Sequence, residues 1–80
     1  MDRMQVLLIT EVIHHAYNAG LIAHDEMKIC GITITMQMFS TFNQLTTVYN
    51  HRLMSISIYD SDSDNSIASS IENLLTDITK

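Results

Sequence analysis

The stretch ICGITITMQM, from Ile29 to Met38, decides the fold of this chain. A period of two residues is the signature of a strand with one buried face, and β-branched residues suit a pleated surface. The stretch therefore predicts a half-buried strand whose apolar face needs a cover from elsewhere in the chain. Gly31, near its start, indicates a bulge or a close approach of two backbones. The alternation sets Ile32, Ile34, Met36 and Met38 against Thr33, Thr35 and Gln37.

A second alternation, RLMSISIY, runs from Arg52 to Tyr59 and predicts another strand. Its serine face should be in contact with water, because antiparallel sheets are commonly covered on one side only. The connector from Leu21 to Lys28 has a charged centre and separates the first strand from the segment before it.

Residues 39–51 fit two structures. As a helix, the segment would begin at Ser40 and carry an apolar stripe. As a strand, residues 45–49 supply good strand formers, and Asn50-His51 would make a two-residue turn, since Asn tolerates positive φ. The low helix propensity of Thr, Val, Tyr and Asn favours the strand.

An amphipathic helix is expected at each end of the chain. Residues 2–19 begin with Asp2 as N-cap and Gln5 in the capping-box position, and Gly20 follows where a left-handed C-cap belongs. The last helix follows the acidic run of residues 60–66, with Asn65 or Ser66 as an early cap and Ser69 as a late one. The expected apolar stripes are Leu8, Ile9, Val12, Ile13, Ala16 and Tyr17 in the first helix and Ile67, Ile71, Leu74 and Ile78 in the last.

The order of these elements predicts an α+β domain, α-β-β-β-α, with two helices on one face of a small antiparallel sheet. If residues 39–51 are helical, the order becomes α-β-α-β-α. A chain of 80 residues sustains one core, so residues 1–80 form a single domain.

The charge of the chain excludes two classes of partner. The net charge is −5, and the only cations are Arg3, Lys28, Arg52 and Lys80. Binding to nucleic acid or to an anionic membrane draws on several cations at once, so we expect neither. No leader or membrane-spanning segment is visible, and Cys30 is the only cysteine, which together predict a soluble cytoplasmic protein without an intrachain disulfide.

The acidic run offers one weak metal site. Asp60, Asp62 and Asp64 occupy positions 1, 3 and 5 of a calcium loop, but Asn65 replaces glycine at position 6 and Ile71 replaces the bidentate glutamate at position 12. The alternative is a solvated turn that favours the helix N-terminus. No other metal and no cofactor is expected.

Catalysis is not expected, because no histidine is tied to Cys30 and no phosphate-binding loop is present. The C-terminal region instead predicts a protein-binding module for a basic surface, acting as an inhibitor or modulator by occupying that surface. Small acidic domains of this composition are common among mobile-element products that bind host or defence proteins. The alternatives are weak calcium binding and a structural homo-oligomer. The expected partner-binding residues are Asp60, Asp62, Asp64, Glu72 and Asp77.

A homodimer is also expected, since so small a domain without disulfide or zinc gains stability by burying apolar surface against a second copy. The 4-3-4 spacing of the last helix is typical of helix pairing. The same side chains would otherwise cover the sheet of their own chain. The expected interface consists of Ile71, Leu74, Leu75 and Ile78.

Overall fold

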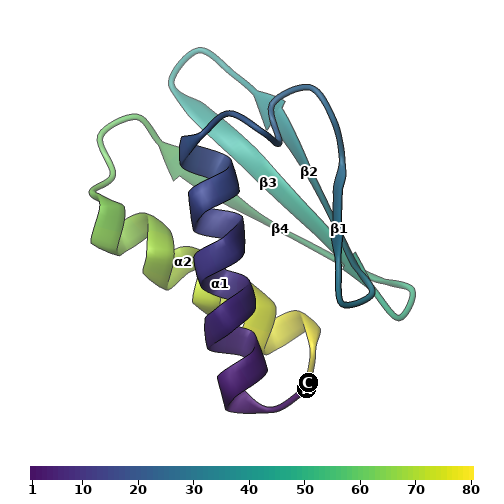
Figure 1. Ribbon diagram of the computed structural model, residues 1–80. Helices are drawn as coiled ribbons and strands as arrows, with labels where there is room; N and C mark the ends of the chain where they lie inside the picture. The colour runs from purple at the N-terminus through teal and green to yellow at the C-terminus, as the bar shows by residue number, and fades with distance from the viewer.

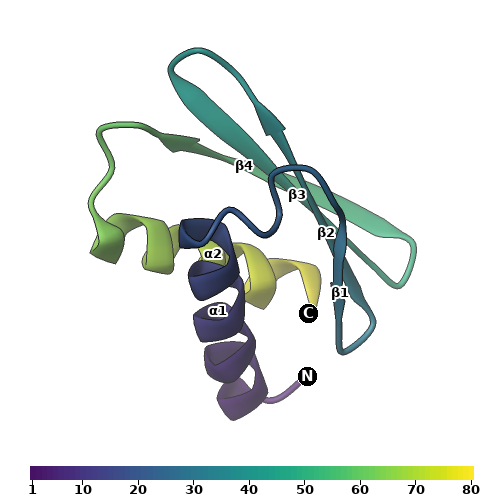
Figure 2. The same ribbon diagram turned by 45° about the horizontal axis from the view of Figure 1, so that its top comes forward.

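Two helices lie on one face of a four-stranded antiparallel sheet in the computed structural model, which describes residues 1–80 (Figures 1 and 2). The predicted α+β class, the two helices and the strand interpretation of residues 39–51 are confirmed. The sheet has the strand order β1-β2-β3-β4, and every neighbouring pair is antiparallel. The elements are α1 (Arg3–Asn18), β1 (Met27–Ile29), β2 (Ile32–Met38), β3 (Phe42–Tyr49), β4 (Arg52–Tyr59) and α2 (Asp64–Ile78).

The stretch that was expected to be one strand is a hairpin. Cys30 and Gly31 have φ values of 50° and 78°, and they form a two-residue turn between β1 and β2. Gly31 is therefore a turn residue and not a bulge. The strand β1 begins at Met27, inside the predicted connector, so the sheet gains a short strand that the alternation did not reveal.

The turn predicted at Asn50-His51 is confirmed. Both residues have positive φ, 49° and 64°, as a type I′ turn requires. The β3–β4 ladder then runs without a bulge from the pair Tyr49–Arg52 to the pair Phe42–Tyr59. Strand β3 thus turns Leu45 and the buried Thr47 toward the helices, and the Thr47 hydroxyl donates to the Met54 carbonyl oxygen at 3.2 Å.

The core lies between the sheet and the two helices. Helix α2 packs on β3 and β4, and α1 packs against α2. The accessible surface is 4942 Å², close to the value of about 4,900 Å² expected for a compact monomer of this mass. One chain therefore closes its own core. The largest fully buried apolar side chains are Ile13, Ile22, Ile32, Ile34, Leu45, Ile58, Ile71, Leu75 and Ile78.

The apolar seam of α2 covers the sheet of its own chain. The four side chains predicted to form a dimer interface are 0% to 2% exposed, so they offer no surface to a second copy. Their predicted role is corrected, whereas the homodimer itself stays a prediction. The helix begins after Ser63, whose side chain accepts from the Ser66 amide at 3.2 Å, and not at any of the three expected caps. The four residues of the predicted dimer interface that are buried in this way are Ile71, Leu74, Leu75 and Ile78.

Helix α1 has the predicted capping box at Asp2, and its C-terminal turn closes at Gly20, with a φ of 73°. Its buried face, however, is rotated from the expected stripe. Leu8 and Val12 are 56% and 45% exposed, whereas Thr10 is buried. Thr10 can be buried because its hydroxyl donates to the Val6 carbonyl oxygen within the same helix, at 2.7 Å. Neither helix of the structure is long and apolar enough to cross a membrane.

Candidate functional site

No helix or loop covers the outer face of the sheet, opposite the helices (Figure 2). The strand registers show that this face is also almost free of charge. Strand alternation and register place one residue in two on this face. Only Lys28, on the edge strand β1, is charged. An open face of this kind offers hydroxyl, amide and aromatic groups to a partner. Its residues are Lys28, Thr33, Thr35, Gln37, Phe42, Gln44, Thr46, Val48, Leu53, Ser55, Ser57 and Tyr59.

Three aromatic rings gather at one end of this face. The ring centroids of Phe39 and Phe42 are 4.7 Å apart with nearly parallel planes, and those of Phe42 and Tyr59 are 5.5 Å apart. Phe42 and Tyr59 are partners in the β3–β4 register, and Phe39 reaches them across the β2–β3 turn. Phe39 and Tyr59 remain 44% and 51% exposed. No local sequence pattern indicates this cluster, because it depends on pairing between strands.

The acidic run begins directly after the cluster and folds back on it. The Asp60 amide donates to the Thr41 carbonyl oxygen at 3.1 Å, and the Asp62 carboxylate accepts from the Tyr59 amide at 2.9 Å. Asp64 follows at the first residue of α2, with His14 as its nearest basic neighbour, 3.9 Å away. We call these residues together the aromatic–acidic end, which comprises Phe39, Phe42, Tyr59, Asp60, Asp62 and Asp64.

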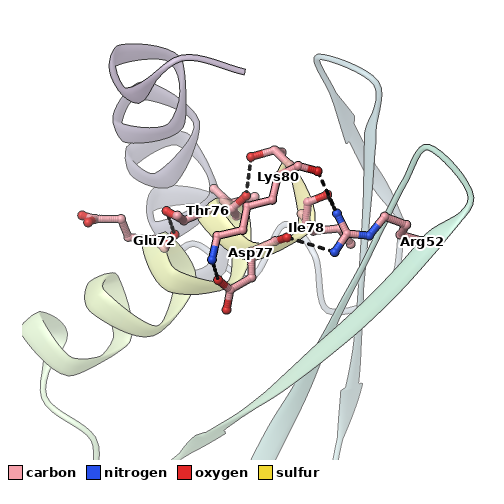
Figure 3. Close-up of polar contacts among 8 residues, drawn as sticks. Arg52, Glu72, Thr76, Asp77, Ile78 and Lys80 are labelled. Carbon is pink, nitrogen blue, oxygen red and sulfur yellow. Dashed lines mark hydrogen bonds and ion pairs between the residues drawn. The ribbon is translucent and has the colours of Figure 1, made fainter.

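The five predicted partner-binding carboxylates fall into two groups. Those of Asp60, Asp62 and Asp64 have no Lys or Arg partner. Glu72 is paired with Arg3 at 2.6 Å. Asp77 is paired with Lys80 at 3.3 Å (Figure 3). Asp60 and Asp62 of the first group follow Tyr59 directly, and no Lys or Arg of the chain neutralises the charge of this group.

All four cations of the chain have partners within it. Besides the pairs of Arg3 and Lys80, Lys28 lies 3.6 Å from Glu26. The Arg52 guanidinium donates to three backbone carbonyl oxygens at the end of α2 (Figure 3). The surface therefore presents no cluster of unpaired cations for phosphate groups.

The structure does not assemble the calcium ligands that the loop spacing suggested. No group of three or more His, Cys, Asp or Glu side chains is placed to hold a metal ion. One oxygen of the Asp62 carboxylate accepts from the Tyr59 amide, and Asp64 lies in the first turn of α2. The acidic run thus behaves as a turn that leads into a helix.

An open groove runs along α1. The open groove has a volume of about 510 Å³. Glu11 and His15 are its only polar side chains that could exchange protons, and no nucleophile lies with them. Cys30 is exposed in the β1–β2 turn, and no histidine bonds to it. The lining residues are Glu11, Val12, His15, Ala16, Ala19, Leu21 and Met27.

Comparison of this chain with known protein families, with curated proteins and with solved structures finds no match. The surface of the chain itself therefore provides the evidence for its function. Two features of that surface stand out, namely the aromatic–acidic end and the outer face that leads up to it, where Lys28 is the only charged residue.

Proposed function

We propose that this chain is a protein-binding domain that docks its aromatic–acidic end onto a basic surface of a partner protein. It acts as an inhibitor or modulator by occupying that surface. The single observation that carries the proposal is the stacked pair Phe39–Phe42, of which Phe39 is exposed, beside carboxylates that have no Lys or Arg partner. Exposed aromatic residues are typical of the few positions that dominate binding energy at protein interfaces.

The chemistry of this end is complementary to arginine and lysine. Aromatic faces attract guanidinium and ammonium groups, and the rings of Phe39 and Tyr59 are accessible to them. The neighbouring carboxylates of Asp60 and Asp62 can accept hydrogen bonds from the same cations. A net charge of −5 would also steer a basic partner toward the chain.

Two observations support a protein partner over nucleic acid or a membrane. Every Lys and Arg of the chain already has a partner within the chain, so phosphate groups find no free cation. The outer face leading to the site carries a single charge, at Lys28, as suits a docking surface that is dehydrated on binding. Because Cys30 cannot form an intrachain disulfide, we place this activity in the cytoplasm.

The charged half of the site is tested with the combined variant Asp60→Asn, Asp62→Asn and Asp64→Asn. Asparagine keeps a side-chain oxygen, so the turn at Tyr59 is preserved. A partner captured from the native host at low salt, or an arginine-rich peptide, should associate about tenfold more slowly, with a smaller change in dissociation rate.

The control is a second triple variant, Glu11→Gln, Asp25→Asn and Glu26→Gln, which removes the same charge from positions outside the aromatic–acidic end. Equal effects of the two triple variants would mean that net charge alone acts and would contradict the proposed site. The proposed site is also contradicted if no protein and no arginine-rich peptide binds at any salt concentration.

The aromatic half is tested with Phe39→Ala. Loss of this exposed ring should raise the dissociation rate about tenfold, since truncation of an anchoring aromatic removes contact made only in the complex. Leu21→Ala is the control, because Leu21 is 69% exposed and lies in the groove on α1. A larger rise in the dissociation rate for Leu21→Ala than for Phe39→Ala would indicate that the partner binds in that groove instead.

A further inference from the structure

Strand β4 is an unprotected edge of the sheet. It is eight residues long, contains no proline, glycine or lysine, and pairs without a bulge to β3 on its inner side only. The other edge strand, β1, has only three residues. A long regular edge presents a row of unpaired amides and carbonyls to another strand, and proteins usually shorten, bend or charge such edges.

The hydrogen bonds at the end of β4 show which backbone groups face outward. The Asp60 amide donates to Thr41, on the β3 side, whereas the Tyr59 amide and carbonyl are both bonded to Asp62 on the other side. Successive residues of a strand point their backbone groups to alternate sides. Every second residue before Tyr59 therefore directs its backbone groups to the free edge. The amides and carbonyls of Ser57, Ser55 and Leu53 have no hydrogen-bond partner within the chain there.

We propose that β4 pairs with β4 of a second copy, antiparallel, about a two-fold axis between Ser55 and its counterpart. Leu53 of each copy then lies opposite Ser57 of the other. In this register all three outward amides and all three outward carbonyls of each chain find partners. Asp62 closes the ladder at Tyr59, because it already satisfies both backbone groups there. The two sheets become one.

Side chains and charges fit the same register. On the helix side, Met54 lies opposite Ile56 of the second copy, and both are half-buried at the edge in the single chain. The two acidic loops lie at opposite ends of the paired strands, since Asp60 of each copy lies opposite Asn50 of the other. Ten residues at about 3.3 Å each keep the loops about 33 Å apart, well beyond the Debye length at physiological salt. A second copy can therefore approach despite the net negative charge.

Cysteine cross-linking tests the axis directly. In a Cys30→Ser background, Ser55→Cys places two thiols opposite each other, at a Cα separation of about 5.5 Å that a disulfide can span. Mild oxidation should give a covalent dimer of twice the 9.1 kDa chain mass. Ser57→Cys, which lies opposite Leu53, should cross-link at least about tenfold more slowly. Equal rates, or faster cross-linking through Ser57→Cys, would overturn the register.

Two proline variants test the edge by light scattering. Ser55→Pro removes an outward amide that the chain itself does not use, and it should raise the dimer dissociation constant about 30-fold or more. Met38→Pro is the control on the opposite edge, beyond the reach of β1. Its amide also points away from β3, because the Phe39 amide donates to the Phe42 carbonyl oxygen. A wild-type mass of 9.1 kDa at high concentration, or a dimer that survives Ser55→Pro, would overturn the proposal.

Amide exchange of the wild-type chain keeps the proposal testable if Ser55→Pro does not fold. The amides of Leu53, Ser55 and Ser57 should be protected at high protein concentration and exchange freely at low concentration. Equal exchange at both concentrations would overturn the pairing. Protection that arises only when another protein is added would assign the edge to a foreign strand and also overturn it. This edge is distinct from the aromatic–acidic end, so failure of one proposal leaves the other standing.

Discussion

The guanidinium of Arg52, at the first residue of β4, donates to the carbonyl oxygen of Ile78, at the last residue of α2, at a distance of 3.0 Å (Figure 3). The same guanidinium reaches the carbonyl oxygens of Asp77 and Lys80, each at 3.1 Å. The last carbonyls of a helix lack partners within it and carry partial negative charge, which a cation neutralises. Arg52 therefore ties the end of the chain to the hairpin of the sheet.

Arg52→Ala should lower the free energy of unfolding by about 1–2 kcal/mol, because three charge-assisted hydrogen bonds at a solvent-exposed site are lost. In a domain of this size that corresponds to a fall in Tm of about 4 °C or more. Thermal unfolding followed by circular dichroism measures it. Lys28→Ala is the control, since its exposed pair with Glu26 should contribute less than about 0.5 kcal/mol. Equal losses in the two variants would contradict the role given to Arg52.

The combined variant Leu75→Glu and Ile78→Glu should unfold the chain, because both side chains are fully buried in it and a carboxylate there has no partner. Circular dichroism and light scattering together give the outcome. Leu8→Glu with Leu21→Glu, at exposed positions, should leave the fold intact. A folded monomer from Leu75→Glu and Ile78→Glu would instead restore the α2 seam as a dimer interface.

His51→Gly should stabilise the chain by about 1 kcal/mol. His51 holds a φ of 64°, which is unfavourable for a residue with a Cβ, and Asn-Gly is the preferred pair for a type I′ turn. His15→Gly, in the last turn of α1, is the matched control and should destabilise by about 1 kcal/mol. Chemical denaturation of both variants checks the two signs, and a loss of stability in His51→Gly would refute the strain argument.

Millimolar calcium should leave Tm unchanged. A ligand that binds the folded state must raise its stability, and the structure gathers no set of three carboxylates for the ion. Differential scanning calorimetry with and without calcium decides the matter. A rise in Tm that Asp60→Asn with Asp64→Asn abolishes would show that the acidic run rearranges into a calcium site.

Local patterns in the sequence determined the elements of this fold. The capping box at Asp2 and Gln5 and the turn at Asn50-His51 depend on residues only a few positions apart, so their chemistry could be interpreted without the fold. The same is true of the alternation from Arg52 to Tyr59. The hairpin at Cys30-Gly31 is also local, but apolar residues on both sides made the segment look continuous.

Tertiary structure alone decided which apolar surfaces are covered and which residues form the candidate site. The spacing of the α2 seam fits a foreign helix and its own sheet equally well, and only packing on β3 and β4 selects the sheet. In α1, Thr10 is buried and Leu8 is exposed, which depends on how the helix packs against the rest of the chain. The aromatic–acidic end requires Phe42 to pair with Tyr59, 17 residues away. Periodicity reports which residues share a face, whereas contacts between faces depend on register and on the packing of distant elements.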